Sequence, residues 1–226
     1  MAEGIWAGGS LEDGGVGGNP MVKEIQIFIE GGGNSTYGRE RLRAGFGRFF
    51  GAVVQRTRKH AVRWRLIMCG PRVETFKRFQ QALRLHPDAF NILLVDAEGP
   101  VKGPPWAHLA AHQDDQWQRP SDASEEACHL MVETVEAWLL ADPEALERYY
   151  GKGFAMGSLP RTKNVESIPK ATVTTALERA TQGTQKGGYH KIDHCSDLLG
   201  MVDPERVRAR APHCEQLFSV LEGLLP

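Results

Sequence analysis

The first half of the chain alternates between short hydrophobic runs and longer amphipathic segments. The hydrophobic runs have the length and composition of buried strands and cover residues 22–30, 62–68 and 91–95. Two amphipathic segments separate them. The first has its apolar positions at helical spacing, at Leu42, Phe46, Phe49, Phe50 and Val53. The second covers residues 73–85. This order predicts an α/β fold with a doubly wound, mainly parallel sheet.

Two of the predicted strands end on an acidic residue that glycine follows. The first ends at Glu30, before Gly31-Gly32-Gly33, and the third runs into Asp96-Ala97-Glu98-Gly99. With the strand order 2-1-3, these two strands are neighbours and their carboxyl ends flank the topological switch point. We therefore expect Glu30, Asp96 and Glu98 to meet in one crevice. The alternative is that these acids cap the helices that follow.

The second half of the chain has a different character. Residues 101–124 lack periodicity and predict a long loop, and residues 125–226 predict a mostly helical remainder. Helices are expected over residues 125–140, 143–150 and 170–181 and in a pair after residue 204, with an irregular stretch over 151–168. A Gly-rich extension over residues 1–20, expected to be flexible, precedes a single domain over 21–226, with its βαβαβ core in 21–100.

The expected helix over residues 125–140 carries further polar groups. His129, Glu133 and Glu136 are spaced to share one helical face. Acids at the edge of a helix that packs on the sheet can supply metal ligands or a base that orients water. Alternatively, the two glutamates are solvent-exposed surface residues.

Composition is that of an ordinary globular protein. The 226 residues are 41% hydrophobic and carry a formal net charge of -1. No apolar run is long enough to span a bilayer, so we expect no membrane partner. Four cysteines without a C-x-x-C pair favour a cytoplasmic location. A zinc site remains an alternative, although the spacing matches no known ligand pattern. Its candidate ligands are Cys128, His129, His190, His194, Cys195, His213 and Cys214.

Charge is distributed unevenly along the chain. The segment from Arg39 to Arg84 is rich in arginine and contains only two acids, Glu40 and Glu74. A basic segment in a chain with an acidic cluster suits a protein that holds a polyanion and binds divalent cations. Alternatively, exposed helix faces simply carry arginine.

The acidic residues favour a magnesium or manganese site over zinc, because hard cations prefer carboxylate oxygens. The candidate ligands are Glu30, Asp96, Glu98 and Glu133. The candidate phosphate contacts are Arg39, Arg43, Arg72 and Lys191. In the glycine-rich turn over residues 186–191, Lys186 and His190 are placed to stabilise charge on a phosphate, unless the turn is only a basic surface loop.

Five motifs carry a resemblance to a known family. They are residues 27–33 (IFIEGGG), 69–76 (CGPRVETF), 94–100 (LVDAEGP), 129–142 (HLMVE through WLLAD) and 186–191 (KGGYHK). Together they resemble the bacterial family called domain of unknown function 4276, over essentially everything from Met21 onward. The acids at the strand ends also resemble the TOPRIM fold shared by topoisomerases, primases and overcoming-lysogenization-defect nucleases.

This resemblance implies a metal-dependent nuclease or phosphoryl-transfer subunit that acts on nucleic acid, in a phage-defence system with an ATPase partner. In the TOPRIM pattern Glu30 is the first-strand acid, and Asp96 and Glu98 are the paired acids. Glu98 stands where aspartate is more usual, which leaves the number of metals open. The alternative is a non-catalytic module that docks on the ATPase, favoured if Trp106 and Trp117 form an exposed patch.

Overall fold

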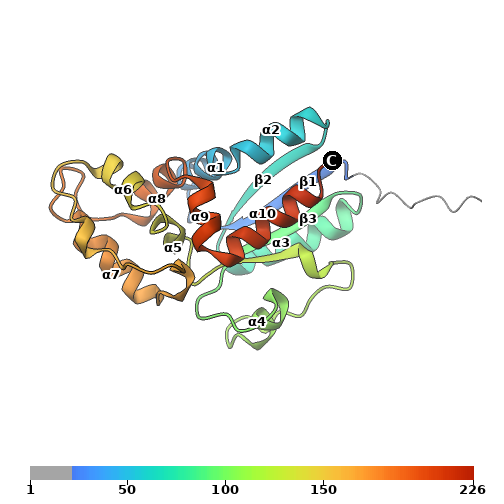
Figure 1. Cartoon of the computed structure of the whole chain (residues 1–226). Coiled ribbons are helices and arrows are strands. Elements are labelled where there is room, and N and C mark those ends of the chain that lie inside the picture. Colours follow the sequence, from blue (N-terminus) through green and yellow to red (C-terminus); the bar gives the residue numbers. More distant parts are fainter. Residues whose placement is uncertain (1–21) are drawn as a thin grey trace, which may run out of the picture.

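The computed structural model describes residues 22–226, which form an α/β fold around an all-parallel sheet (Figure 1). The predicted extension over residues 1–20 lies outside this range. The sheet has the order β2-β1-β3-β4, so the expected 2-1-3 arrangement of the first three strands is confirmed. The strands are β1 (Glu24–Glu30), β2 (Arg63–Gly70), β3 (Phe90–Asp96) and β4 (Cys128–Met131).

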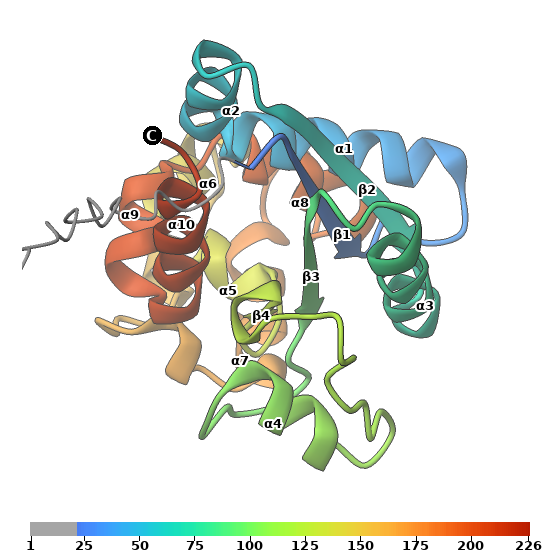
Figure 2. The ribbon, with the colours of Figure 1, turned by 90° about the vertical axis from the view of Figure 1, so that its right-hand side faces the viewer.

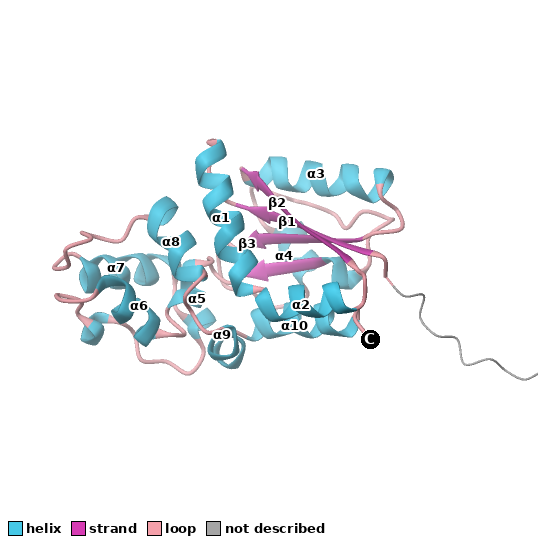
Figure 3. Cartoon of the chain, turned by 90° about the horizontal axis from the view of Figure 1, so that it is seen from above, coloured by secondary structure: helices cyan, strands magenta, loops and turns pink. Residues whose placement is uncertain are grey.

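Helices cover both faces of the sheet, as the strand pattern predicted (Figure 3). One face packs on α1 (Thr36–Phe49), α2 (Gly51–Lys59) and α10 (Pro212–Gly223). The other packs on α3 (Arg72–Leu85) and α4 (Pro105–Ala111). The central strand β1 is consequently buried on both sides, with Ile27 facing the first group and Phe28 the second.

The remaining helices lie beyond the carboxyl ends of the strands (Figures 1 and 3). They are α5 (Glu136–Leu139), α6 (Pro143–Tyr150), α7 (Lys170–Thr181), α8 (Lys191–Leu199) and α9 (Pro204–Arg210). The expected start of α6 is confirmed, because Asp142 caps the helix by accepting a hydrogen bond from the Ala145 N–H at 3.2 Å. This helical part therefore stands over the edge of the sheet where the acidic residues end.

The predicted helix over residues 125–140 is wrong. A short 3-10 turn (Glu125–Ala127) leads into β4, and only Glu136–Leu139 is α-helical. All four residues of β4 are buried, because this strand pairs with β3 under helices on both faces. A short run that is apolar on every side fits a buried strand and a buried helix equally well, so its spacing misled the prediction.

Two helices were missed. The predicted loop over residues 101–124 contains α4, whose seven residues are too few to show a period; Pro105 starts it and Trp106 is buried in the core. The basic turn over residues 186–191 runs directly into α8, which His190 caps from the preceding position. Because the turn glycines and the helix start are adjacent, composition alone predicted only a turn.

Candidate metal centre

Three carboxylates converge where β1 and β3 end. Glu30 is the last residue of β1, Asp96 is the last of β3, and Glu98 follows two residues later. One oxygen from each lies within 4.8 Å of the others. This is the grouping expected from adjacent parallel strands, whose carboxyl ends lie at one edge of the sheet.

Asp96 is the buried member of the cluster, with only 5% of its surface exposed. Its Oδ1 accepts a hydrogen bond from the Val135 N–H at 2.9 Å, and its Oδ2 accepts one from the Thr134 hydroxyl at 3.3 Å. Burial raises the pKa of Asp96 to about 7, although the Lys191 ammonium opposes that rise. The site thus contains a desolvated acid whose negative charge is incompletely balanced.

Glu30 is held by an arginine. Arg72 Nη1 donates to Glu30 Oε2 at 2.9 Å and also to the Asp96 carbonyl. The other guanidinium nitrogens bind the Asp115 carboxylate, with Nη2 at 2.7 Å, and the guanidinium lies over the Trp117 ring. Burial raises the pKa of Glu30, and Arg72 reduces the rise. Arg72 was predicted to contact phosphate, but here it orients a candidate metal ligand.

Glu98 is the most exposed of the three acids and adopts an unusual backbone conformation. Its φ of 61° lies in the left-handed region, which only a few per cent of non-glycine residues occupy. Its carboxylate pairs with the Lys170 ammonium. The candidate ligand Glu133 is instead engaged elsewhere: its Oε2 accepts a hydrogen bond from the Lys170 N–H at 2.8 Å and so caps the start of α7.

Glu136 and Lys191 form a second charged group next to Asp96. The Lys191 ammonium lies 3.6 Å from Asp96 Oδ2 and 3.3 Å from Glu136 Oε1. Glu136 is buried; its Oε1 accepts a hydrogen bond from the Tyr189 hydroxyl, and its Oε2 contacts the Thr134 hydroxyl oxygen. Burial alone would lower the pKa of Lys191, but the two carboxylates raise it overall. Lys191 therefore remains a cation at the edge of the carboxylate cluster.

A cavity of about 610 Å³ opens beside the acids. Glu30 and Asp96 form one side of it and the glycine loop (residues 31–33) another, while Tyr189, His190 and Lys191 cover it from the start of α8. Leu42 and Phe46 of α1 contribute an apolar wall. The cavity thus joins carboxylates, open backbone and a lysine in one space large enough for a small ligand or a nucleotide unit.

The glycine loop owes its shape to positive φ angles. Gly31, Gly32 and Gly33 have φ of 117°, 80° and 61°. A Cβ on Gly32 would lie 2.8 Å from the Arg39 Cα, so α1 approaches too closely for any side chain there. Arg39 in turn donates to the carbonyls of Gly33 and Asn34. The predicted phosphate contact Arg39 therefore holds the loop that lines the cavity.

Other predicted site residues lie apart from the acids. The Lys186 ammonium stacks over the Tyr149 ring at 4.6 Å, and Arg43 Nε donates to the Leu66 carbonyl on β2. His129 is buried in β4, where burial lowers its pKa to about 4 and its Nε2 lies 3.0 Å from the Glu126 carbonyl. His129 therefore stays neutral and structural, and it does not share a face with Glu133 and Glu136 as predicted.

Two alternatives from the sequence lack the geometry they need. Among residues 22–226, Glu30, Asp96 and Glu98 are the one group of three or more acids, histidines or cysteines close enough to hold a metal ion, so the zinc constellation is not assembled. Trp106 is buried and its Nε1 donates to the Ser124 carbonyl, while Trp117 stacks on Phe76. These tryptophans do not form the exposed patch that would favour docking on a partner.

The structure adds residues that the sequence pattern did not indicate. Asp115, Thr134 and Lys170 each contact a member of the carboxylate cluster or the arginine that holds it. None of them lies at the end of a predicted strand. Their contacts join residues far apart in the chain: Asp115 is 43 residues from Arg72, Thr134 is 38 residues from Asp96, and Lys170 is 72 residues from Glu98. No local signal marks such contacts.

Comparison with known proteins identifies only a family. Residues 29–222 match the family described as Domain of unknown function (DUF4276), and this range contains all three clustered acids. No curated protein and no solved structure matches the chain. Over residues 22–226, every helix is too short or too polar to cross a membrane.

Proposed function

The chain belongs to the family described as Domain of unknown function (DUF4276), and on that premise we propose that it is a magnesium- or manganese-dependent phosphodiesterase acting on nucleic acid. The observation that carries this proposal is the convergence of Glu30, Asp96 and Glu98 oxygens within 4.8 Å at the ends of adjacent strands. Three clustered carboxylates, of which Glu30 and Asp96 line a cavity with room for phosphate, suit a hard divalent cation.

The electrostatics of the residues fit such a cation. Burial raises the pKa of both Glu30 and Asp96, so each carboxylate is less stable as an anion than in water. A divalent ion held by Glu30, Asp96 and Glu98 would offset this cost. When bound, it would polarise a phosphoryl oxygen and make water a stronger nucleophile.

The chain's own groups have distinct roles in this proposal. Arg72 fixes Glu30 Oε2, which leaves the other carboxylate oxygen for the ion. Lys191, beside Asp96 and lining the cavity, supplies positive charge for a phosphate oxygen. Glu136 holds Lys191 from its buried side at 3.3 Å, and His190 lines the same cavity as a hydrogen-bonding group for phosphate.

We further propose a relation to the TOPRIM fold. The parallel sheet, the central first strand ending on Glu30 and the neighbouring strand ending on Asp96 support that relation. Glu98 in place of the usual aspartate is a longer side chain that can still reach a metal ion. By this relation the protein is a nuclease subunit that works with an ATPase in phage defence.

Cleavage assays test the proposal. The purified chain is incubated with single-stranded, duplex and supercoiled DNA and with RNA, in Mg²⁺ or Mn²⁺, alone and with an ATPase encoded beside it. We expect cleavage that Glu30→Gln and Asp96→Asn abolish. Glu178→Gln, an exposed acid on α7, is the matched control and should cut like the parent. Intact substrates under every condition, or equal cutting by all variants, would overturn the proposal.

A further inference from the structure

The open edge of the sheet lies in the most basic region of the chain. β2 is the edge strand: β1 pairs with one side of it, and within residues 22–226 no strand pairs with the other. Figure 2 shows this strand running between α1 and α3. Residues 36–85, from α1 through α3, contain thirteen Lys and Arg against two Glu, while the whole chain has a net charge of -1.

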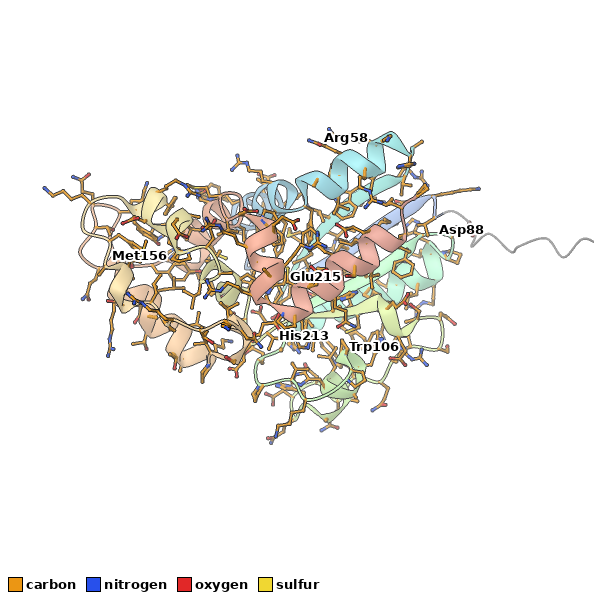
Figure 4. All side chains as sticks on the ribbon, viewed as in Figure 1. Arg58, Asp88, Trp106, Met156, His213 and Glu215 are labelled. Carbon is orange, nitrogen blue, oxygen red and sulfur yellow. The ribbon has the colours of Figure 1, made fainter. Side chains whose placement is uncertain are left out.

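Four arginines lie on β2 or on the helices that pack on it, α1, α2 and α3. Arg43 on α1 donates from Nε to the Leu66 carbonyl of β2 at 3.2 Å. Arg65 on β2 and Arg78 on α3 line one shallow groove of about 180 Å³ together with Gln81. Arg58 is exposed on α2, which also packs on β2, and its side chain points to solvent (Figure 4). We call Arg43, Arg58, Arg65 and Arg78 the basic edge.

The charge of the basic edge is available for a ligand. Among the described residues, Arg43, Arg58 and Arg78 form no ion pair, and Arg65 has only a distant one, 3.7 Å from Glu24. Other arginines are neutralised: Arg41 pairs with Asp197, and Arg208 pairs with Glu215 and Glu222. Cations that lack close acidic partners within the protein favour a bound polyanion.

The basic edge leads to the carboxylates. β2 ends at Gly70, and Gly70 lines the same cavity as Glu30 and Asp96. The strand's eight residues extend for about 26 Å at the usual rise per residue. That length covers roughly eight phosphates of one strand of a duplex.

We propose that the basic edge binds the sugar–phosphate backbone of a nucleic acid and guides it to the carboxylate cluster, an inference that rests on the proposed function. Arginine suits phosphate because its planar fork donates two parallel hydrogen bonds. An anionic membrane fits less well. The exposed apolar residues nearby, Val73 and Leu85, sit at opposite ends of α3 and offer no continuous face for insertion.

Binding is measured without cleavage to test this proposal. The full chain is titrated with fluorescein-labelled 20-nucleotide single-stranded and 20-base-pair duplex DNA, in EDTA, at several KCl concentrations between 50 and 200 mM. The edge variant combines Arg43→Gln, Arg58→Gln, Arg65→Gln and Arg78→Gln. The charge-matched control combines four exposed cations of the helical part: Lys152→Gln, Arg161→Gln, Lys163→Gln and Arg179→Gln.

The edge variant should bind DNA at least tenfold more weakly at 50 mM KCl. The slope of log affinity against log salt should fall by about three to four, because each lost phosphate contact removes about one unit. The control should match the parent. Equal losses in both variants, or no binding by the parent, would overturn the proposal. The proposal would also be overturned if the parent bound anionic vesicles more strongly than DNA and the edge variant bound neither.

The two proposals fail separately in these assays. DNA binding in EDTA by a chain that never cuts would leave the basic edge standing and reject the phosphodiesterase. Metal-dependent cutting, together with DNA binding that the edge variant does not weaken, would support the phosphodiesterase and reject the basic edge.

Discussion

At the scale of single residues, the fold buries Asp96 and thereby destabilises its charged form. Its carboxylate ends a buried strand and has lost most of its hydration, and burial raises its pKa to about 7 from the ordinary value of 3.8. A natural globular chain keeps such a group only when something offsets the cost. In the proposed site, the offset is a divalent ion.

The first prediction concerns pH. The folded chain without metal binds a proton at Asp96 between pH 3.8 and about 7, where the unfolded chain does not. Asp96 therefore lowers the free energy of unfolding as pH rises through that window. Asp96→Asn should remove this decline, which in the parent amounts to roughly 3 kcal/mol between pH 5 and pH 8 in EDTA. Urea titrations of the parent and the variant at pH 5 and pH 8 measure the free energy of unfolding. The same pH dependence in both proteins would contradict the prediction.

The second prediction at this scale concerns Arg72, which positions the candidate metal ligand Glu30. It binds Glu30, Asp115 and the Asp96 carbonyl at once, which a lysine cannot reproduce. We expect Arg72→Lys to weaken Mn²⁺ binding by about 10-fold or more while the fold persists, as for other residues that orient metal ligands. Isothermal titration gives the affinity. Arg84→Lys, at an exposed arginine on the same helix, is the control, and an equal affinity in both variants would show that Arg72 does not position the site.

At the scale of elements, the strands and the glycine loop are the parts that the sequence predicted well. In residues 22–30 the alternation of Ile25, Ile27 and Ile29 fits a strand, and Glu30 followed by glycine marked where that strand stops. The prediction failed for β4 and α4. Both are short, and β4 is buried on every side, so neither has a polar face from which a period can be read.

The glycine loop gives an element-scale prediction. Gly32→Ala places a Cβ 2.8 Å from the Arg39 Cα at a φ of 80°, so the loop must shift. We expect a loss of roughly 1–3 kcal/mol in the free energy of unfolding together with weaker Mn²⁺ binding. Gly47→Ala is the control, since Gly47 lies within α1 with open space around it and should gain about 0.5–1 kcal/mol. Similar stabilities for the two variants would refute this account of the loop.

At the scale of the whole molecule, the candidate site contains two groups of residues, and only the first could be predicted from the sequence. The strands bring Glu30, Asp96 and Glu98 together, and adjacency of their carboxyl ends followed from the predicted strand order. The residues that surround these acids come from the helical part and the α4 segment, through contacts such as Lys191 with Asp96 and Arg72 with Asp115. Such contacts depend on tertiary packing and leave no periodic signal.

Because metal ligands come from separate strands, an ion should stabilise the entire fold. A concentration of Mn²⁺ 100-fold above its dissociation constant adds about 2.7 kcal/mol to the free energy of unfolding. For a chain of this size the melting temperature should rise by roughly 5–10 °C. Thermal melts with and without Mn²⁺ measure the shift. It should vanish in Glu30→Gln and persist in Glu178→Gln; a shift that survives in Glu30→Gln would place the ion elsewhere.

The most direct test of the metal centre is a crystal structure of the full chain soaked in Mn²⁺, with anomalous scattering used to locate the ion. We expect a peak between the ends of β1 and β3, with oxygens of Glu30, Asp96 and Glu98 at distances on the order of 2.1 Å. A crystal that shows no peak there, or binds manganese only at other residues, would contradict it.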